Sequence, residues 1–215
     1  MVLTPTLEVE TALWNQGQSR VAGVDEAGLG CLAGPIVAAA VLLPPFCTMI
    51  EGVRDSKLLS LPQREKLFDQ VREQAIAVGV GIATVREIEQ INVLRASYLA
   101  MQRALARIKP FDHALIDGRP IKHADLGSHT AIIDGDAICY AIACASIIAK
   151  VRRDRFMKKL SNRYPGYGWE RNVGYGTKQH TQAIQDLGVT PHHRKTYAPV
   201  QQALKQLELF TELKD

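Results

Sequence analysis

The length and composition of this chain are those of a globular protein with one substantial core. It has 215 residues, of which 47% are hydrophobic and 22% are charged. Its formal net charge of +4 is compatible with a nucleic-acid partner, and its longest apolar stretch is broken by prolines before it reaches the roughly 20 residues of a transmembrane helix. We therefore expect no membrane partner.

The cysteines and the amino terminus both favour a reducing compartment. Residues 1–18 contain acidic side chains and lack the basic-then-apolar order of a signal peptide. None of the cysteines belongs to a Cys-x-x-Cys pair, and all have apolar or small neighbours, so we expect buried free thiols. The cysteines are Cys31, Cys47, Cys139 and Cys144. From these features we expect a cytoplasmic protein, and we expect it to act as a monomer.

The order of the predicted elements is typical of an α/β protein with a single sheet. Short β-branched runs bounded by Gly or Pro predict strands, and the first two are expected to be antiparallel neighbours. Capping-box spacing at Ser60 and Thr84 predicts a helix start after each residue. Helical periodicity predicts longer helices over residues 94–108 and 139–160, and a helical tail over 201–215. The strands are expected over residues 21–24, 36–43, 78–83 and 113–116.

Asp25 and Glu26 follow the first predicted strand and precede the turn Ala27-Gly28-Leu29-Gly30. Successive side chains of a strand point to opposite faces, so these two acids share a ligand only if the backbone leaves the strand there, which the glycines permit. The pair then indicates a metal-dependent phosphodiester enzyme. A solvated acidic turn is the alternative, because such short motifs recur by chance.

Two later acids repeat this arrangement of strand, acid and glycine. Asp117-Gly118 ends the strand at 113–116, and Asp117 is expected beside Asp25 if the two strands are adjacent. An ordinary Asp-Gly turn is the alternative. Asp136 precedes the long helix rich in small residues, where it is either a ligand or a residue that favours the helix amino terminus. Asp134 is a weaker candidate for the same role.

Three segments of the second half suit a nucleic-acid ligand. The basic half of the helix from Lys150 is either a solvated face or a contact for a phosphate backbone. Residues 164–180 mix glycine, aromatic and basic residues, which suits sugar and phosphate binding or an aromatic-pinned surface loop. In residues 191–197, His192 and His193 lack the partners of a zinc site, and we interpret this segment as a cationic substrate edge.

Several motifs in register along almost the whole chain resemble ribonuclease HII, the type 2 ribonuclease H family that cuts RNA strands paired to DNA. The resemblance implies an α/β ribonuclease H-like fold, with a mixed central sheet flanked by helices. It also implies one catalytic domain over residues 1–215, with a substrate-binding C-terminal helical extension from about residue 160 to 215. The matching stretches are residues 21–28, 32–35, 55–58, 116–118, 135–136, 145–151, 174–177 and 192–194.

The resemblance also implies the residues of the site and the reaction. The catalytic, metal-binding carboxylates would be Asp25, Glu26, Asp117 and Asp136, with Asp25 shared between two Mn²⁺ or Mg²⁺ ions, which prefer oxygen ligands. The substrate-binding residues would be Gly28, Leu29, Gly30, Lys57, Tyr175 and Arg194. The expected activity is hydrolysis of the RNA strand of RNA–DNA hybrids and incision 5′ of ribonucleotides in duplex DNA, leaving 3′-hydroxyl and 5′-phosphate ends for ribonucleotide removal in replication and repair.

The chain departs from the family pattern in two places. Leu29 stands where the family has arginine in its Gly-Arg-Gly turn, and Asn172-Val173 stand where the family often has His-Lys. Backbone groups of a glycine turn can still hydrogen-bond a ribose 2′-hydroxyl, so we expect ribonucleotide recognition to survive with a weaker hold on phosphate, unless Arg54 or Lys57 compensates. Two alternatives remain open, namely another nuclease of the same fold and a catalytically weak hybrid-binding protein.

Overall fold

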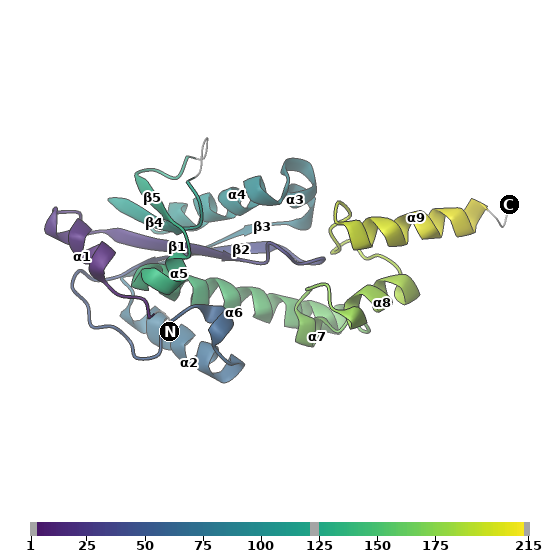
Figure 1. Cartoon of the computed structure of the whole chain (residues 1–215), viewed down its shortest axis with the longest axis horizontal. Helices are drawn as coiled ribbons and strands as arrows, with labels where there is room; N and C mark the ends of the chain where they lie inside the picture. Colours follow the sequence, from purple (N-terminus) through teal and green to yellow (C-terminus); the bar gives the residue numbers. More distant parts are fainter. Residues whose placement is uncertain (1–3, 121–124, 213–215) are drawn as a thin grey trace. The chain divides into compact units, whose positions relative to one another are not determined.

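The computed structural model describes residues 4–120 and 125–212 and contains a mixed five-stranded sheet with helices around it (Figure 1). The chain forms two compact units. The first comprises the described parts of Met1–Ala27, Val37–Ile82 and Ser97–Arg152. The second comprises those of Gly28–Ile36, Ala83–Ala96 and Arg153–Asp215. The expected C-terminal extension thus lies within the second unit, which also takes in two earlier segments.

The sheet has the strand order β3-β2-β1-β4-β5. Its central strand β1 is antiparallel to β2, as the sequence predicts, and parallel to β4, which is in turn parallel to β5. All positions of β2 are buried, which fits its uninterrupted run of apolar residues. The strands are β1 Val21–Ala27, β2 Ile36–Leu42, β3 Ala77–Ala83, β4 His113–Asp117 and β5 His129–Ile132.

The helices begin where the capping motifs predict. Glu87 accepts a hydrogen bond from the Thr84 N–H at 2.8 Å, and Gln63 accepts one from the Ser60 N–H at 2.9 Å. These reciprocal bonds satisfy backbone donors that a helix start leaves unpaired. The helices are α1 Glu8–Asn15, α2 Leu61–Gln74, α3 Val85–Ile91, α4 Val93–Ala106, α5 Gly135–Ile138, α6 Tyr140–Arg163, α7 Trp169–Asn172, α8 Lys178–Leu187 and α9 Ala198–Glu212.

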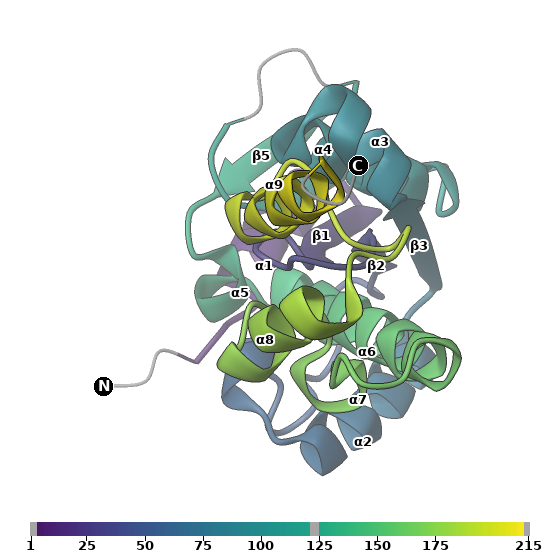
Figure 2. The same ribbon diagram turned by 90° about the vertical axis from the view of Figure 1, so that its right-hand side faces the viewer.

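Helices cover both faces of the sheet in the first unit, with α4 on one face and α6 with α2 on the other (Figures 1 and 2). Both approaches depend on glycines. A Cβ at Gly23 of β1 would lie 2.1 Å from the carbonyl carbon of Ala141 in α6, and one at Gly81 of β3 would lie 1.9 Å from the carbonyl oxygen of Ala100 in α4. Close packing therefore holds the strand that carries the predicted acids in a rigid core.

The second unit has an apolar core of its own around the fully buried Trp169. Leu32 and Ala33 from the amino-terminal half of the chain pack there with Met157 of α6 and Ile184 of α8. Segments far apart in the sequence are thus joined in one unit. No helix among residues 4–120 and 125–212 is long and apolar enough to cross a membrane.

Candidate active site

The register of the parallel strands places Asp25 beside Asp117. Val24 of β1 is paired with Ile116 of β4, and each acid is the next residue of its strand. The juxtaposition predicted from the sequence is therefore confirmed. The acids of two neighbouring strands lie at the same edge of the sheet, where a buried scaffold fixes their positions.

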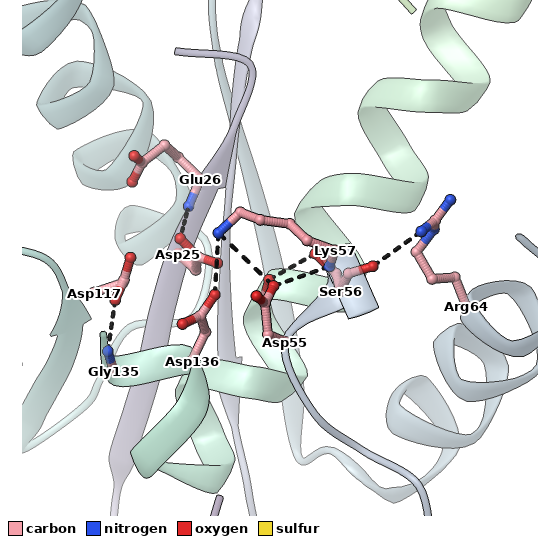
Figure 3. A network of polar contacts seen from close by, with 10 residues as sticks. Asp25, Glu26, Asp55, Ser56, Lys57, Arg64, Asp117, Gly135 and Asp136 are labelled. Carbon is pink, nitrogen blue, oxygen red and sulfur yellow. Dashed lines mark hydrogen bonds and ion pairs between the residues drawn. The ribbon is translucent and has the colours of Figure 1, made fainter. Parts of the chain in front are cut away.

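The prediction that the backbone leaves the strand at Asp25 and Glu26 is wrong. The ladder with β2 continues past both acids to the pair formed by Ala27 and Val37. The two side chains therefore project to opposite faces of β1, and Figure 3 shows the Glu26 carboxylate directed away from that of Asp25. The Glu26 N–H donates to Oδ1 of Asp25 at 2.6 Å. Small apolar partners in β2 let the ladder extend this far, and the turn begins only afterwards.

Asp117 and Asp136 are held by the short helix α5. The Gly135 N–H donates to Oδ1 of Asp117 at 2.7 Å, so this acid binds the amino terminus of α5 (Figure 3). Asp136 is buried on the first turn of the same helix. Asp134 is exposed and has a left-handed backbone conformation, with φ of 53°. Of the two candidates, Asp136 is therefore the buried one, whereas Asp134 is exposed and acts on the site only through its charge, which helps to raise the pKa of Asp117.

Lys57 brings a positive charge to the acids. It lies on the short 3-10 helix Ser56–Leu58, and its Nζ is 3.3 Å from Oδ2 of Asp136 and 3.7 Å from Oδ1 of Asp55 (Figure 3). Asp55 also accepts a hydrogen bond from the Lys57 N–H at 2.9 Å, which fixes the start of this turn. Asp55 was not predicted as a site residue, although its position two residues before Lys57 in a matching motif was a usable signal.

Ser146 of α6 is a second site residue that was not predicted from the sequence. It hydrogen-bonds the Asp25 carboxylate, and its hydroxyl lies 2.8 Å from that of Ser56. Both serines are buried. They connect the central acid to the segment that carries Lys57, and they supply polar partners in an otherwise apolar region of the core.

The environment raises the pKa of all four predicted carboxylates. Burial raises the pKa of Asp25 well above its usual value, and repulsion from Glu26 and Asp117 adds to this effect. Burial and repulsion from Asp117 raise the pKa of Glu26 to about 7, although Lys57 opposes them. Burial also raises the pKa of Asp117, and it raises that of Asp136 to about 6 against the opposing charge of Lys57. The cluster thus holds more negative charge than its own cation balances.

This donor set fits a divalent cation. Clustered carboxylates supply the oxygen ligands that Mg²⁺ and Mn²⁺ prefer, and a bound cation would relieve the repulsion that raises their pKa values. Within residues 4–120 and 125–212, no three His, Cys, Asp or Glu side chains converge closely enough to enclose a metal ion as they stand. The fit therefore rests on the chemistry of the donors and on the burial of Asp25, which is 4% exposed.

The predicted glycine turn lies in the second unit, and buried cations hold its carbonyl groups. The Arg194 guanidinium donates to the carbonyl oxygens of Gly28 at 2.6 Å, of Leu29 at 2.8 Å and of Gly34 at 2.9 Å. The Tyr197 hydroxyl also donates to that of Leu29, at 2.7 Å. Arg194 has no exposed surface. Its hydrogen bonds therefore fix the backbone of the turn, and any contribution to substrate binding is indirect.

Arg153 holds the other end of the same segment. It lies on the basic half of α6, where the sequence indicated a solvated or phosphate-binding face, yet it is fully buried. Its guanidinium donates to the carbonyl oxygens of Pro35 and Ala33, each at 3.0 Å, and to that of Val173 at 2.8 Å. A Cβ at Gly28, where φ is 106°, would lie 2.2 Å from Nε of Arg153. Charge patterning alone does not reveal an arginine that satisfies buried carbonyl groups.

Tyr175 lies next to the glycine turn within the second unit. It forms an antiparallel bridge with Cys31, and the Leu32 N–H donates to the carbonyl oxygen of Gly174 at 2.8 Å. The side chain of Tyr175 is 42% exposed, whereas Leu29 in the turn is 37% exposed. Both residues are therefore accessible to a ligand, as a substrate-binding role requires.

The prediction that residues 191–197 form a cationic edge is wrong for the two histidines of this segment. His193 is fully buried, and burial lowers its pKa to about 3, so its ring is neutral. His192 is partly buried with a lowered pKa, and its ring lies edge-on to that of Tyr164, with centroids 5.1 Å apart. The sequence could not distinguish buried from exposed rings because both occur in loops rich in polar residues.

Comparisons with known proteins decide the family. The family model for ribonuclease HII matches residues 22–200. The chain belongs to the ribonuclease HII family. It is 60% identical over 192 residues to the ribonuclease HII of Thermosynechococcus vestitus, covering 89% of this chain and 90% of the relative. It is 50% identical over 202 residues to that of a Synechococcus strain, covering 93% and 90%.

Structural similarity agrees with the ribonuclease HII sequence match. The crystal structure of ribonuclease H2 from Pyrococcus horikoshii has a TM-score of 0.66 to this chain at 25% identity, covering 88% of this chain and 99% of the other. The mixed sheet with its helices is thus the ribonuclease H-like α/β fold predicted from the sequence. As a ribonuclease HII, the protein is a hydrolytic enzyme with ribonuclease H activity on RNA–DNA hybrids.

Proposed function

We propose that this enzyme incises duplex DNA on the 5′ side of an embedded ribonucleotide, and also hydrolyses the RNA strand of longer hybrids, leaving 3′-hydroxyl and 5′-phosphate ends. The products suit ribonucleotide removal during replication and repair. The observation that carries the proposal is the juxtaposition of Asp25 and Asp117 on paired strands, with Glu26 and Asp136 close enough for their charges to help raise the pKa of Asp25.

In this proposal the four carboxylates bind two divalent ions, Mn²⁺ or Mg²⁺. Bound cations would supply activation of water and stabilisation of the leaving 3′-oxygen. Asp25 is the central ligand because it is buried and its pKa responds to the other three acids. The Gly135 N–H orients Asp117, and Lys57 balances part of the negative charge beside Asp136.

Recognition of the ribonucleotide is assigned to the second unit. Arg194 and Arg153 hold the segment from Gly28 to Pro35, so its backbone groups keep a fixed shape for hydrogen bonding to a 2′-hydroxyl. The exposed ring of Tyr175 offers a flat apolar surface for the sugar of the next nucleotide, where a 2′-hydroxyl is absent in DNA. These roles favour an RNA–DNA junction over an all-DNA duplex.

The deciding experiment is cleavage of a labelled DNA duplex that carries one ribonucleotide, measured with Mn²⁺, with Mg²⁺ and with a chelator. Incision 5′ of the ribonucleotide in either metal, absent with the chelator, is the expected result. An all-DNA duplex of the same sequence and the Asp25→Asn variant are the matched controls. Tight binding without incision by the wild-type protein would contradict the proposal and favour a hybrid-binding role.

A further inference from the structure

A chain of hydrogen bonds through two buried histidines ends on the main chain of Tyr175. The Thr190 N–H lies 3.0 Å from Nδ1 of His193, the Nε2 atoms of His193 and His180 are 3.1 Å apart, and Nδ1 of His180 lies 2.9 Å from the carbonyl oxygen of Tyr175. The indole Nε1 of Trp169 lies 2.9 Å from Nε2 of His180. Neither imidazole has exposed surface. We refer to His180 and His193 as the histidine pair.

Two groups that can only donate fix the tautomers of the histidine pair. An indole N–H donates to Nε2 of His180, so in the neutral ring the hydrogen is on Nδ1 and points to the carbonyl oxygen of Tyr175. The backbone N–H of Thr190 donates to Nδ1 of His193. In the neutral ring of His193 the hydrogen is therefore on Nε2 and points to His180. The bonds from Thr190 through His193 and His180 to Tyr175 then run in one direction. Nε2 of His180 accepts from both the indole and His193, and the Thr190 hydroxyl, 2.9 Å from Nδ1 of His193, donates to it beside the backbone N–H.

The neutral state of both rings is consistent with their surroundings. Burial lowers the pKa of His180 and of His193, and for His193 the nearby His180 adds to the effect. A second proton on either ring would turn an accepting nitrogen into a donor that faces another donor. Buried polar groups with complete partners hold a single arrangement, so the histidine pair is a rigid support.

The hydrogen bonds of the histidine pair fix the main chain of Tyr175. Its carbonyl oxygen accepts from His180 and from the Thr177 N–H at 2.8 Å, and its own N–H donates to the carbonyl oxygen of Asn172 at 2.9 Å. The preceding Gly174 has φ of 89°, and a Cβ there would lie 2.5 Å from the carbonyl oxygen of Ala33. The backbone of Tyr175 is thus fixed on both sides, while the residue as a whole remains 42% exposed.

We propose that the histidine pair consists of positioning residues for Tyr175, with the Nδ1–H of His180 holding the tyrosine backbone so that its ring is presented to the sugar beyond the ribonucleotide. The inference rests on the substrate role proposed above for Tyr175. It assigns to His180 and His193 a part in substrate specificity that requires no contact with substrate.

The first test concerns the hydrogen bonds alone and needs no activity. Long-range ¹H–¹⁵N correlation spectra of the wild-type protein report which ring nitrogen carries hydrogen in each histidine. We expect the Nδ1–H tautomer for His180 and the Nε2–H tautomer for His193. The opposite tautomer at His180, or a doubly protonated ring at neutral pH, would overturn the proposal.

The second test uses a matched pair of variants at His180. The amide of His180→Asn can take the place of Nδ1 and still donate to Tyr175, whereas the amide of His180→Gln reaches the place of Nε2 and loses that donor. The readout is the specificity ratio, defined as kcat/KM on the single-ribonucleotide duplex divided by kcat/KM on a continuous RNA–DNA hybrid. Loss of one positioning hydrogen bond predicts a fall of about 3- to 10-fold in this ratio for His180→Gln. For His180→Asn we expect a ratio close to that of the wild type.

A purely structural role would lower both kcat/KM values together and leave the specificity ratio unchanged. The Tyr175→Ala variant should also lower the ratio, and adding His180→Gln to it should produce no further fall, because the two changes act through one group. If His180 variants fold poorly, the same test applies one step earlier: His193→Asn loses the donor toward His180 and should lower the ratio, whereas His193→Gln keeps a donor there and should not.

The outcomes separate this inference from the proposed function. If Tyr175→Ala lowers the specificity ratio but His180→Gln does not, the positioning role is overturned and the substrate role of Tyr175 stands. If Tyr175→Ala leaves the ratio unchanged, Tyr175 does not determine substrate specificity, and the positioning role of the histidine pair is overturned as well. A wild-type protein that does not incise the ribonucleotide duplex contradicts the proposed function, whereas the tautomer measurement still reports on the histidine pair.

Discussion

The ammonium of Lys57 lies 3.3 Å from the Asp136 carboxylate and so supplies a positive charge to a cluster with four acids. Its side chain is 73% exposed, so solvent screens much of this attraction. Although partial burial opposes it, attraction to Asp136, Asp55 and Asp25 raises the pKa of Lys57, which keeps the ammonium charged. Lys57 therefore lowers the cost of ionising its neighbours in the folded protein, and solvent screening limits what this adds to stability.

Replacing Lys57 with methionine is expected to raise the pKa of Asp136 above about 6 and that of Glu26 above about 7, because Lys57 lowers both values in the native protein. Carboxyl ¹³C chemical shifts of the metal-free protein, followed against pH, measure the change. Lys57→Arg keeps the charge and is the matched control. Unchanged titration in Lys57→Met would show that the ammonium does not act on these acids.

Replacing Asp25 with asparagine is expected to abolish cleavage while stabilising the metal-free protein. The change removes a buried carboxylate that repels Glu26 and Asp117 and keeps a side chain of similar size. Substitutions that relieve such functional strain commonly add about 0.5–2 kcal/mol to the free energy of unfolding. Chemical denaturation measures this effect. A destabilised variant would show that the hydrogen bonds of the Asp25 carboxylate outweigh its burial and its repulsion from the other acids.

Divalent cations provide a separate check of the same residue. A ligand that binds only the folded state raises the melting temperature, so Mn²⁺ should raise that of the wild-type protein and have a much smaller effect on Asp25→Asn. An equal shift in both proteins would place the cation elsewhere. Asp69→Asn is a suitable control because Asp69 is an exposed acid on α2.

The stability of the metal-free protein should fall as the pH rises from about 4.5 to about 7. The pKa of Glu26 is raised from 4.5 to about 7 in the folded protein, so in this window the folded state binds more protons than the unfolded state. The slope of the free energy of unfolding against pH is then negative, and the loss from Glu26 amounts to at most about 3 kcal/mol. Below the window the acid is protonated in both states, and above it the acid is ionised in both. Glu26→Gln should flatten this dependence of stability on pH. If the variant showed the same dependence as the wild-type protein, the loss of stability would not come from Glu26.

Local patterns in the sequence predicted the elements well, whereas long-range contacts decided the details of the site. Capping motifs at Ser60 and Thr84 depend on neighbouring residues, so both helix starts were correctly predicted. The strand end at Asp25 was not, because the extent of the ladder depends on the partner strand β2. The juxtaposition of Asp25 and Asp117 followed from the rule that sites form at strand ends, once the strands were assumed adjacent.

The burial of the arginines and histidines could not be predicted from the sequence. Arg153 and Arg194 resemble surface cations in the sequence, yet their guanidinium groups satisfy carbonyl oxygens of the segment from Gly28 to Pro35. His193 was predicted to be cationic, yet its partners leave it neutral. In each case the partner is more than 100 residues away, or becomes identifiable only once a loop is folded. Residue type alone does not determine these pairings.

Arg194→Lys is expected to destabilise the protein and weaken substrate binding together. A lysine ammonium cannot reproduce the planar set of bonds to Gly28, Leu29 and Gly34, so buried carbonyl groups lose their donors. The cost of such losses is about 1–3 kcal/mol of unfolding free energy. Denaturation measures the first effect, and substrate binding in a catalytically inactive Asp25→Asn background measures the second. Weaker binding by a variant of unchanged stability would instead indicate direct contact between Arg194 and substrate.

Leu29→Arg is expected to leave stability almost unchanged and to strengthen binding in a salt-dependent way. The side chain of Leu29 is 37% exposed, and the contacts that hold the turn involve its carbonyl oxygen, so a change of side chain should alter the free energy of unfolding by less than about 0.5 kcal/mol. One added phosphate contact steepens the slope of log K against log salt concentration by about 0.9. Leu29→Met is the uncharged control. An unchanged slope in Leu29→Arg would show that another cation, such as Lys57 or Arg54, already makes the phosphate contact that the family arginine would supply.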